Sequence, residues 1–403
     1  MGQYLFVNKT QTPTVKGRIL PYITSNENKV YIGGGCWDLS VENITNTTHI
    51  DFWEYDINTS SWSQLADMAS DEYEDQGLIG SSAFYINGDV YVIGGCTQGF
   101  LPTESIYKYN VENNEWSICK SGLTTIKSQY TKGVLINGLM YVLFGGVGLY
   151  KYDYKTNILT ACAAFQGSTK AGFDIFSIEN KLYVTGGSST LDMTMAVSGL
   201  DSEIAADIIT ETWCYDTEAD TWSQKASLAT DNTHGLRFHA SIVFGNEVYI
   251  IGSQGSVTDN IINCLYKYSQ ALDTWTKLQD PTLNITRAVT IFYNSNGYIF
   301  TGCSNTQDWQ SATYYKTCYE FAYLLDKPTN LISTYNETTG FIDLSWTDNS
   351  TEETFFQIER KRNDEEEYSL IGTTNSNIIQ FTDENVDIRN YGYRYRVRAV
   401  KYV

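Results

Sequence analysis

The stretch Val90-Tyr91-Val92-Ile93-Gly94-Gly95 decides the fold of this chain. It is a short apolar run that ends in two glycines, and residues 106–109 follow it with alternating tyrosines, before Trp116. A short, β-branched run is typical of a strand that is buried on both faces. Paired glycines permit a positive φ or a close approach of another backbone where a strand ends. We therefore predict neighbouring buried strands here.

The same pattern recurs along most of the chain, and such self-similarity is a strong guide to a repeat fold. The apolar runs that end at glycine are residues 30–34, 90–95, 141–146, 182–187, 248–252 and 298–302. Tyrosine-bearing segments follow these runs, and the spaced tryptophans are Trp62, Trp116, Trp222 and Trp275, with Leu159 in the equivalent place of the third unit. About six units of roughly 50 residues lie in the range of propeller blades.

This pattern resembles the kelch repeat, whose marks are the double glycine, the tyrosine and the spaced tryptophan. The resemblance covers roughly the first 325 residues and implies an all-β fold, a six-bladed β-propeller over residues 1–326. The aromatic residues fall in equivalent places, so we expect them to stack between neighbouring blades. Each buried Trp or Tyr removes ~150–250 Å² from water, which makes these side chains the main packing of the ring.

The two ends of the repeat region complete each other. Residues 3–10 read as a strand that precedes the first complete blade, whereas the sixth blade lacks its last strand before Lys327. We therefore predict that the N-terminal segment supplies the missing strand and closes the ring. Closure removes an open sheet edge that would otherwise favour aggregation.

The connections between the predicted strands differ in length. Hairpins such as Asn87-Gly88 and Asn137-Gly138 are tight. The connections between second and third strands are residues 35–52, 96–105, 147–149, 188–211, 253–263 and 304–313. In a propeller these connections and the links between blades leave from one face. Length variation on one side of a regular scaffold is typical of a binding surface.

Candidate binding residues lie on these variable connections or beside them. Trp37, Phe100 and Trp309 occupy second-to-third-strand connections, where an aromatic ring can stack on a sugar or anchor a protein. Met193 and Met195 lie in the longest connection. Arg237 precedes the first strand of the fifth unit. The alternative use of each is packing over the disc.

The pattern changes from Lys327 onwards. Residues 342–346, which end in a tryptophan, and residues 393–399, Tyr-Arg-Tyr-Arg-Val-Arg-Ala, alternate as strands do. They resemble a fibronectin type III domain, a β-sandwich, which we place at residues 327–403. The family has a seventh strand after the position of Ala399, but only four residues follow here. Either the sandwich ends on a short stub or a partner adds the strand by β-augmentation.

Charge and composition exclude several classes of partner. The formal net charge is −20, from 27 basic and 47 acidic residues, which argues against nucleic acid and against anionic membranes. No apolar run approaches the ~18 residues of a membrane span, so we expect no membrane insertion. The N-terminus has no signal-peptide pattern, so we expect synthesis in the cytoplasm. The eight cysteines form no Cys-x-x-Cys, and we expect free buried thiols.

Catalytic and metal-binding motifs are scarce. There are three histidines, and His234 and His239 flank Arg237 without a metal-ligand spacing. A kelch disc followed by a sandwich also resembles the copper galactose oxidases, but their set of two histidines, two tyrosines and a crosslinked cysteine is not found in these connections. The site residues of a kelch-type sialate mutarotase are single residues scattered along the chain, so this activity stays open as an alternative. We expect no cofactor and no metal.

We therefore expect a non-catalytic binding or structural protein. Its loop-rich face would contact a protein partner or a surface glycan, and the C-terminal domain would serve a larger assembly. Fibronectin-like modules in microbial chains usually act outside the cell, whereas this sequence shows no export signal. A component of a phage virion or tail-like particle fits both observations, because lysis releases such particles without secretion. The alternatives are a carbohydrate-active enzyme, which predicts a deep central pocket with convergent charged residues, and an intracellular kelch scaffold.

Overall fold

The computed structural model describes residues 3–14, 16–37, 47–68, 76–97, 100–190, 208–228, 235–244, 246–254, 261–278, 283, 285–293, 296–304, 313–350, 353, 355–365 and 368–400. Strands and turns make up these residues, and no α-helix occurs among them. The chain divides into two compact units, Phe6–Glu320 and Phe321–Val403 together with Met1–Leu5.

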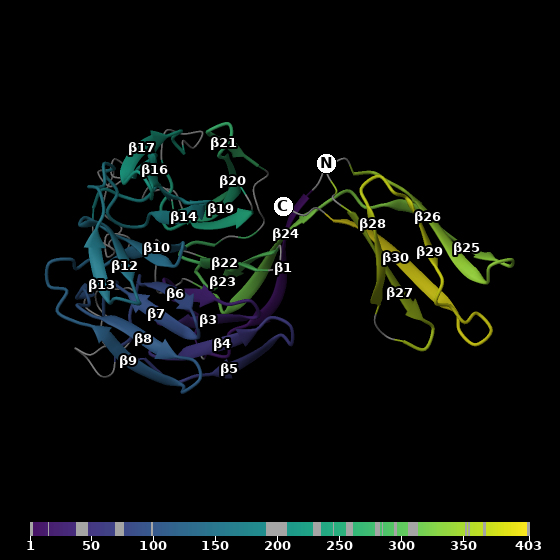
Figure 1. Ribbon diagram of the computed structural model, residues 1–403, viewed down its shortest axis with the longest axis horizontal. Helices are drawn as coiled ribbons and strands as arrows, with labels where there is room; N and C mark the ends of the chain where they lie inside the picture. The colour runs from purple at the N-terminus through teal and green to yellow at the C-terminus, as the bar shows by residue number, and fades with distance from the viewer. Residues whose placement is uncertain are drawn as a thin grey trace. The chain divides into compact units, whose positions relative to one another are not determined.

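Four-stranded antiparallel sheets follow one another along the first unit (Figure 1). The first sheet consists of β2 (Tyr22–Ser25), β3 (Lys29–Gly33), β4 (Phe52–Asp56) and β5 (Ser61–Gln64). The second consists of β6 (Ser82–Ile86), β7 (Asp89–Ile93), β8 (Ile106–Asn110) and β9 (Glu115–Lys120). The third consists of β10 (Thr131–Ile136), β11 (Leu139–Phe144), β12 (Gly148–Asp153) and β13 (Ile158–Ala161).

Three further sheets complete the series. The fourth consists of β14 (Asp174–Ile178), β15 (Lys181–Thr185), β16 (Thr212–Asp216) and β17 (Thr221–Lys225). The fifth consists of β18 (Ala240–Phe244), β19 (Glu247–Gln254), β20 (Ile261–Ser269) and β21 (Thr274–Lys277). The sixth consists of β22 (Val289–Tyr293), β23 (Asn296–Phe300), β24 (Thr317–Leu324) and β1 (Gln3–Gln11).

The sheets form a closed ring. The first strand of each sheet contacts the first strand of the next, in the order β2, β6, β10, β14, β18 and β22, and β22 contacts β2 in turn. Within the second sheet the register Val90↔Tyr109 and Tyr109↔Trp116 places the strands of the repeat side by side. The first strands therefore line the centre of the ring, and the later strands lie further out.

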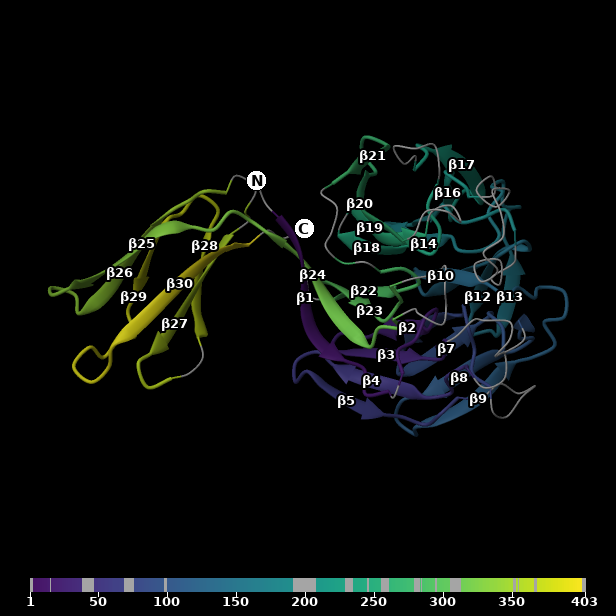
Figure 2. The ribbon, with the colours of Figure 1, turned by 180° about the vertical axis from the view of Figure 1, so that it is seen from behind.

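The N-terminal strand completes the sixth sheet. β1 pairs with β24, so the sheet order is β1-β24-β23-β22, and both views of the ribbon show the purple β1 beside the green β24 (Figures 1 and 2). Lys9 Nζ lies 2.8 Å from a carboxylate oxygen of Glu320, and Thr12 N donates to Lys316 O at 2.7 Å. The prediction from the repeat spacing for residues 3–10 is confirmed.

The spaced tyrosine and tryptophan of the repeat take part in hydrogen bonds that hold the link between neighbouring sheets. In the second sheet Tyr109 Oη donates to Asn114 Oδ1 at 2.7 Å, and that oxygen also accepts from Ala66 N at 2.8 Å. Trp116 Nε1 donates to Ala66 O at 2.8 Å. Equivalent bonds recur for Tyr215, Asp220 and Trp222, and for Tyr268, Asp273 and Trp275. These residues attach the link from the preceding sheet to the outer strands.

Aromatic rings pack between neighbouring sheets, as the repeat predicts. Tyr31 and Tyr85 stack with ring centroids 5.7 Å apart and an interplanar angle of 5°. Further contacts between sheets are Tyr91–Tyr152, Tyr183–Tyr268 and Tyr55–Phe300. Since aromatic pairs at such distances add to the gain from burial, they hold successive sheets in place.

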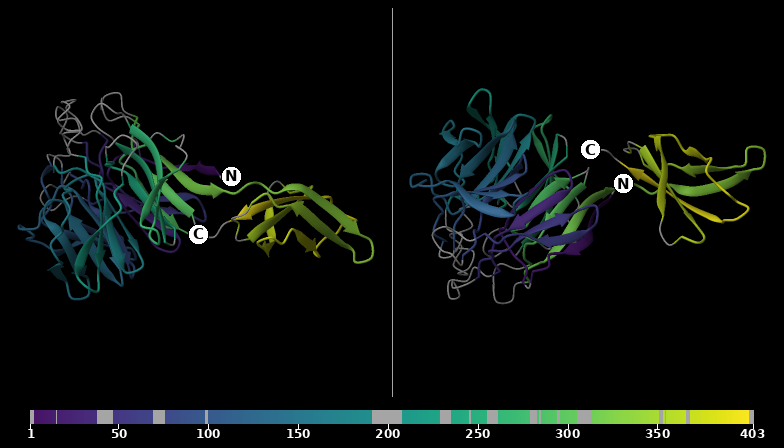
Figure 3. Two further views of the ribbon diagram at one scale, coloured as in Figure 1. Left: turned by 90° about the horizontal axis from the view of Figure 1, so that it is seen from above. Right: turned by 60° about the horizontal axis from the view of Figure 1, so that its bottom comes forward.

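The second unit contains two three-stranded sheets, seen from two sides in Figure 3. One has the order β25 (Thr329–Asn336), β26 (Phe341–Thr347) and β29 (Gln380–Asp383). The other has the order β28 (Ser369–Asn375), β27 (Phe355–Arg362) and β30 (Tyr393–Val400). Their shared core contains Ile342, Leu344, Trp346, Phe356 and Ile358.

Candidate binding face and central cavity

The long connections of the ring begin and end at one edge of the sheets. Isolated β-bridges join a residue near the start of such a connection to its end and to the segment that enters the same sheet. Cys36, which follows β3, bridges both Ile19 before β2 and Thr48 before β4. The same double bridge is centred on Cys96 in the second sheet, Ser188 in the fourth and Cys303 in the sixth. The segment that enters a sheet and the connection between its second and third strands therefore share one face, here called the loop face.

The short turns lie at the opposite edge, here called the turn face. Ile57 N in the turn after β4 donates to Asn28 O in the β2–β3 hairpin at 3.2 Å. The two-residue hairpin Asn87-Gly88 has positive φ at both residues, 51° and 88°, as a tight right-twisted hairpin requires. The predicted separation of long and short connections therefore holds in these sheets.

Small polar side chains sit at the centre of the bridges. Cys96 Sγ donates to Ile79 O at 3.9 Å, and Ser188 Oγ donates to Ala171 O at 3.4 Å. All eight cysteines are free, and burial raises the pKa of the Cys96 thiol. The predicted free thiols at Cys36, Cys96 and Cys303 are thus packing groups beneath the loop face.

A circle of hydrogen bonds joins the sheets at the loop-face end of their first strands. Its members are Gly80 N to Leu20 O (3.1 Å), Thr131 N to Gly80 O (2.8 Å), Tyr130 Oη to Phe173 O (3.0 Å), Phe238 N to Gly172 O (2.6 Å), Arg287 N to Phe238 O (3.0 Å) and Leu20 N to Arg287 O (3.2 Å). The last bond joins the sixth sheet to the first. Closure therefore involves the centre of the ring as well as the outer strand β1.

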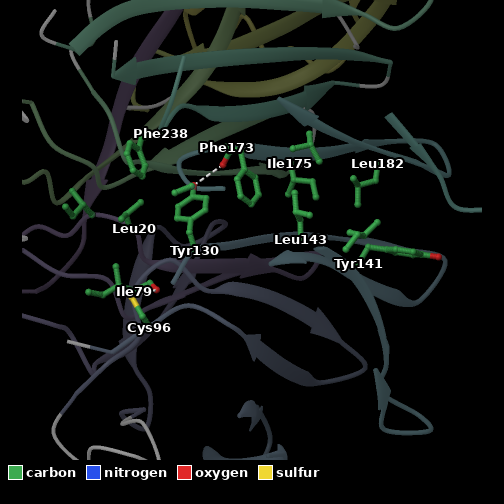
Figure 4. Close-up of a cluster of buried hydrophobic side chains, with 14 of the residues drawn as sticks. Leu20, Ile79, Cys96, Tyr130, Tyr141, Leu143, Phe173, Ile175, Leu182 and Phe238 are labelled. Atoms are coloured by element: carbon green, nitrogen blue, oxygen red, sulfur yellow. Dashed lines mark hydrogen bonds between the residues drawn. The ribbon is translucent and has the colours of Figure 1, made fainter. Parts of the chain in front are cut away.

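Inside this circle, aromatic side chains fill the centre (Figure 4). Tyr130 lies edge-on to Phe173 at 5.1 Å and edge-on to Phe238, from the fifth sheet, at 5.9 Å. The guanidinium of Arg287 stacks on Phe238 at 3.8 Å, and Leu20 belongs to the same buried cluster. We call Leu20, Tyr130, Phe173, Phe238 and Arg287 the plug, because all are buried and together they close the loop-face end of the channel.

A cavity of about 210 Å³ lies in the channel on the turn-face side of the plug. First strands from all around the ring line it, and polar groups on four of the six sheets contact one another. Lys132 Nζ lies 3.5 Å from Asp174 Oδ1, and Ser241 Oγ donates to Asp174 Oδ2 at 2.6 Å. Thr290 Oγ1 in turn donates to Ser241 O at 2.6 Å. The third to sixth sheets are thus linked through polar side chains.

The cavity opens toward the turn face. Its lining residues near the plug, such as Asp174, are buried, whereas Ile23, Val134 and Val243 further along the first strands are half-buried. Between cavity and plug is a hollow of about 10 Å³ beside His239, a space that holds about one water. Burial lowers the pKa of His239 to about 4, so its imidazole is neutral at neutral pH.

The loop face is hollowed where its connections are shortest. A groove of about 380 Å³ lies between the third and fourth sheets, beside the β11–β12 turn. Val147, 40% exposed, and the half-buried Phe165 supply apolar surface, and Ser168 and Lys170 supply polar groups at the rim. Phe165 is held edge-on to Trp222 at 4.8 Å. The groove is therefore a preformed recess of mixed character.

Comparison with known proteins agrees with this geometry. The sequence profile described as the Attractin/LZTR1 beta-propeller matches residues 3–262. The chain belongs to this β-propeller family. It is similar to Kelch-like protein 25 of Xenopus tropicalis, with 25% identity over 56% of this chain and 37% of the relative. Kelch-like protein 41a of Danio rerio is 23% identical over 50% of this chain and 40% of the relative.

The solved structures support the fold. The structure of YjhT matches with a TM-score of 0.55 and 13% identity, over 78% of this chain and 96% of that one. The propeller chain spans about two fifths of the length of the two Kelch-like relatives. In the described part of the propeller chain no group of three or more His, Cys, Asp or Glu side chains could hold a metal ion. No helix in that part is long and apolar enough to cross a membrane.

The propeller places three of the candidate binding residues. Trp37 is half-buried at the base of its connection, and Lys16 Nζ lies 3.0 Å from its ring centroid, so an ammonium group covers one ring face. Phe100 packs against the buried cluster around the plug. Arg237 is 2% exposed, with its guanidinium 5.9 Å from the Phe238 ring. These contacts are packing beneath the loop face. Met193, Met195 and Trp309 lie outside the described residues.

Sequence reasoning missed an ion pair at the same edge between a buried arginine and a half-buried aspartate. Arg18, with no exposed surface, donates twice to Asp51 at 2.8 Å and also to Gly34 O at 3.0 Å. Burial opposes ionisation of Asp51, but Arg18 and the indole of Trp53 lower its carboxyl pKa. Neither residue stands in a motif, so only their meeting in space identifies the pair.

Proposed function

We propose that this protein is a six-bladed kelch propeller that binds a protein partner through its loop face. Six four-stranded sheets among the described residues, and the similarity to Kelch-like proteins, support this proposal. We also propose the domain limits 1–326 for the propeller and 327–403 for a fibronectin type III-like domain. The strand order β25-β26-β29 against β28-β27-β30 is the order expected of such a sandwich without its last strand.

The groove beside Val147 carries the proposal of protein binding. The centre of the loop face is filled by the plug, so a partner reaches the rim of this face rather than a deep axial pocket. The groove combines exposed apolar surface with a lysine and a serine, which suits a side chain or short segment of a protein. An enzyme with convergent charged residues at the loop-face centre is disfavoured by the same plug.

A pair of single substitutions tests the proposal. Val147→Asp places a charge in the groove, whereas Leu272→Asp makes the same change at a position 74% exposed in the β20–β21 turn, on the turn face. Both positions are exposed, so neither change should disturb folding. We expect proteins that co-purify with the parent chain to be lost with Val147→Asp and kept with Leu272→Asp. Equal loss, or equal retention, in the two variants contradicts loop-face binding.

The place of action is a proposal as well. We propose that the protein belongs to a phage virion or tail-like particle, in which the propeller contacts a host protein or surface glycan and the C-terminal unit joins the assembly. The strong negative charge, −20, suits a soluble particle component that avoids nucleic acid. Immunogold labelling of particles from a lysate tests this location. A protein found only in the particle-free fraction argues for the intracellular kelch scaffold instead.

A further inference from the structure

The strand β30 has a partner on one side only. Among the described residues it pairs with β27 and ends the sheet β28-β27-β30. The side chains that it turns to the core, Tyr393, Tyr395, Val397 and Ala399, are half-buried, although Phe356 and Ile358 of the neighbouring strand are fully buried. Within the described ranges, the core beneath β30 is therefore incompletely covered, and the outer edge of β30 presents backbone groups to which another strand could pair.

The opposite face of β30 has a row of arginines. Arg394, Arg396 and Arg398 alternate along the strand and are exposed. Their cross-strand neighbours on β27 are Lys361, Glu359 and Gln357. Glu359 is thus the one facing carboxylate of that row, and both Arg396 and Arg398 contact it. Arg394 faces a lysine, so the row has an excess of positive charge within an acidic protein.

We propose that β30 is a docking edge for an extended segment of a partner protein that has acidic residues at alternate positions. Such a strand would place its carboxylates beside Arg394 and Arg398, where opposite charges on neighbouring strands are favourable. Its other side chains, if apolar, would cover the half-buried Tyr395 and Val397. Main-chain hydrogen bonds would provide the affinity, and the arginine row would make binding specific for an acidic strand.

The same charges disfavour a second copy of this chain. Antiparallel pairing of two β30 strands would set arginines against arginines, and like charges on neighbouring strands are destabilising. Charged residues on an edge are a recognised means of preventing self-association. The arginine row therefore both excludes the homotypic contact and selects an acidic strand. This inference deepens the proposed assembly role of the C-terminal unit and rests on that role.

Three labelled peptides of eight residues test the docking edge with the full chain. They alternate Val with Glu, with Lys or with Gln, and binding is read by fluorescence anisotropy. Amide hydrogen exchange of residues 393–400 locates the contact. We expect the Glu peptide to bind most tightly, the Lys peptide not to bind, and exchange in β30 to slow only with the Glu peptide. Absence of Glu-peptide binding up to about 1 mM, or equal binding of all three, overturns the proposal.

Two variants separate the row from general charge effects. Arg394→Glu with Arg398→Gln keeps the Arg396–Glu359 pair, sets one carboxylate opposite Lys361 and adds no negative charge beside Glu359, so folding should persist. We expect at least tenfold weaker binding of the Glu peptide and new binding of the Lys peptide. Arg389→Glu is the control, because Arg389 is exposed in a loop outside the sheet. Equal loss in the control refutes the assignment.

The remaining outcomes also discriminate. If the β30 amides of the free protein exchange as slowly as those of the internal strand β27, the edge is already covered by a second copy or by this chain, and the proposal is wrong. If the Glu peptide slows amide exchange in β25 or β28 and not in β30, the peptide binds elsewhere and the proposal is likewise wrong. The failure of loop-face binding is recognised separately, since Val147→Asp leaves β30 untouched.

Discussion

Tyr130 gives the most direct test of the plug. Its ring is 1% exposed and packs edge-on to Phe173 and Phe238, and its hydroxyl donates to Phe173 O at 3.0 Å. Tyr130→Phe removes only the hydrogen bond, for which we expect a loss of about 1 kcal/mol in the free energy of unfolding. Tyr130→Ala also removes the ring and leaves a cavity that the surrounding sheets cannot move inwards to fill. For this variant we expect a loss of about 3–5 kcal/mol in the free energy of unfolding.

Urea denaturation followed by tryptophan fluorescence measures both changes. Of the nine tryptophans only Trp346 lies beyond residue 320, so the signal reports mainly on the propeller. Leu272→Ala is the control, because this leucine is 74% exposed and its truncation should cost less than about 0.5 kcal/mol. If Tyr130→Ala costs less than about 1 kcal/mol, or no more than Tyr130→Phe, the ring does not hold the centre together and the plug is wrongly assigned.

Three further predictions concern other parts of the propeller. Arg18→Met leaves the half-buried carboxylate of Asp51 without its guanidinium, although Trp53 still donates to it, so we expect a loss of about 2–3 kcal/mol in urea unfolding. A double variant with Asp51→Asn should reduce that loss, and equal costs in both backgrounds would show that the pair is not coupled. Because the pKa of His239 is about 4 when folded and about 6.5 when unfolded, this histidine alone should lower the free energy of unfolding by about 3 kcal/mol as the pH falls from 6.5 to 4. His49 has a similar shift, so urea unfolding at several pH values should show about half of the total slope removed by His239→Gln, and an unchanged slope would contradict the assignment. Removal of residues 1–11 exposes the edge of β24, so light scattering should detect aggregation that the parent lacks; a soluble, equally stable product would disprove closure by β1.

The repeat pattern predicted the β-propeller type of fold and the strands within each repeated sheet. The glycine-ended runs became the second strands, and the spacing of Tyr109 and Trp116 became a contact that recurs from sheet to sheet. Residues 3–10 were assigned to the last sheet because they read as a strand before the first complete unit, whereas the sixth unit lacked its last strand. These predictions succeeded because each depends on residues that are close in sequence, within one hairpin or one repeat. The alternation of buried and exposed residues, and its recurrence, can therefore be read from the sequence.

The candidate site was less predictable. Trp37 and Phe100, for which the sequence allowed either binding or packing, are partly covered by Lys16 and by the buried cluster, as the packing alternative predicts. The groove beside Val147 was missed because it results from a connection that is short where its neighbours are long. Loop packing depends on what surrounds a side chain, and that information is absent from the residue type.

The sequence by itself determined that repeated four-stranded units close into a ring and that a different strand pattern follows Lys327, because alternation and spacing are properties of the chain. Only the tertiary structure decided what fills the centre of that ring. Tyr130, Phe238 and Arg287 come from three sheets and meet because first strands converge on one axis. Contacts across such distances in sequence have no local pattern, so the plug and the cavity behind it emerge only when the chain is folded.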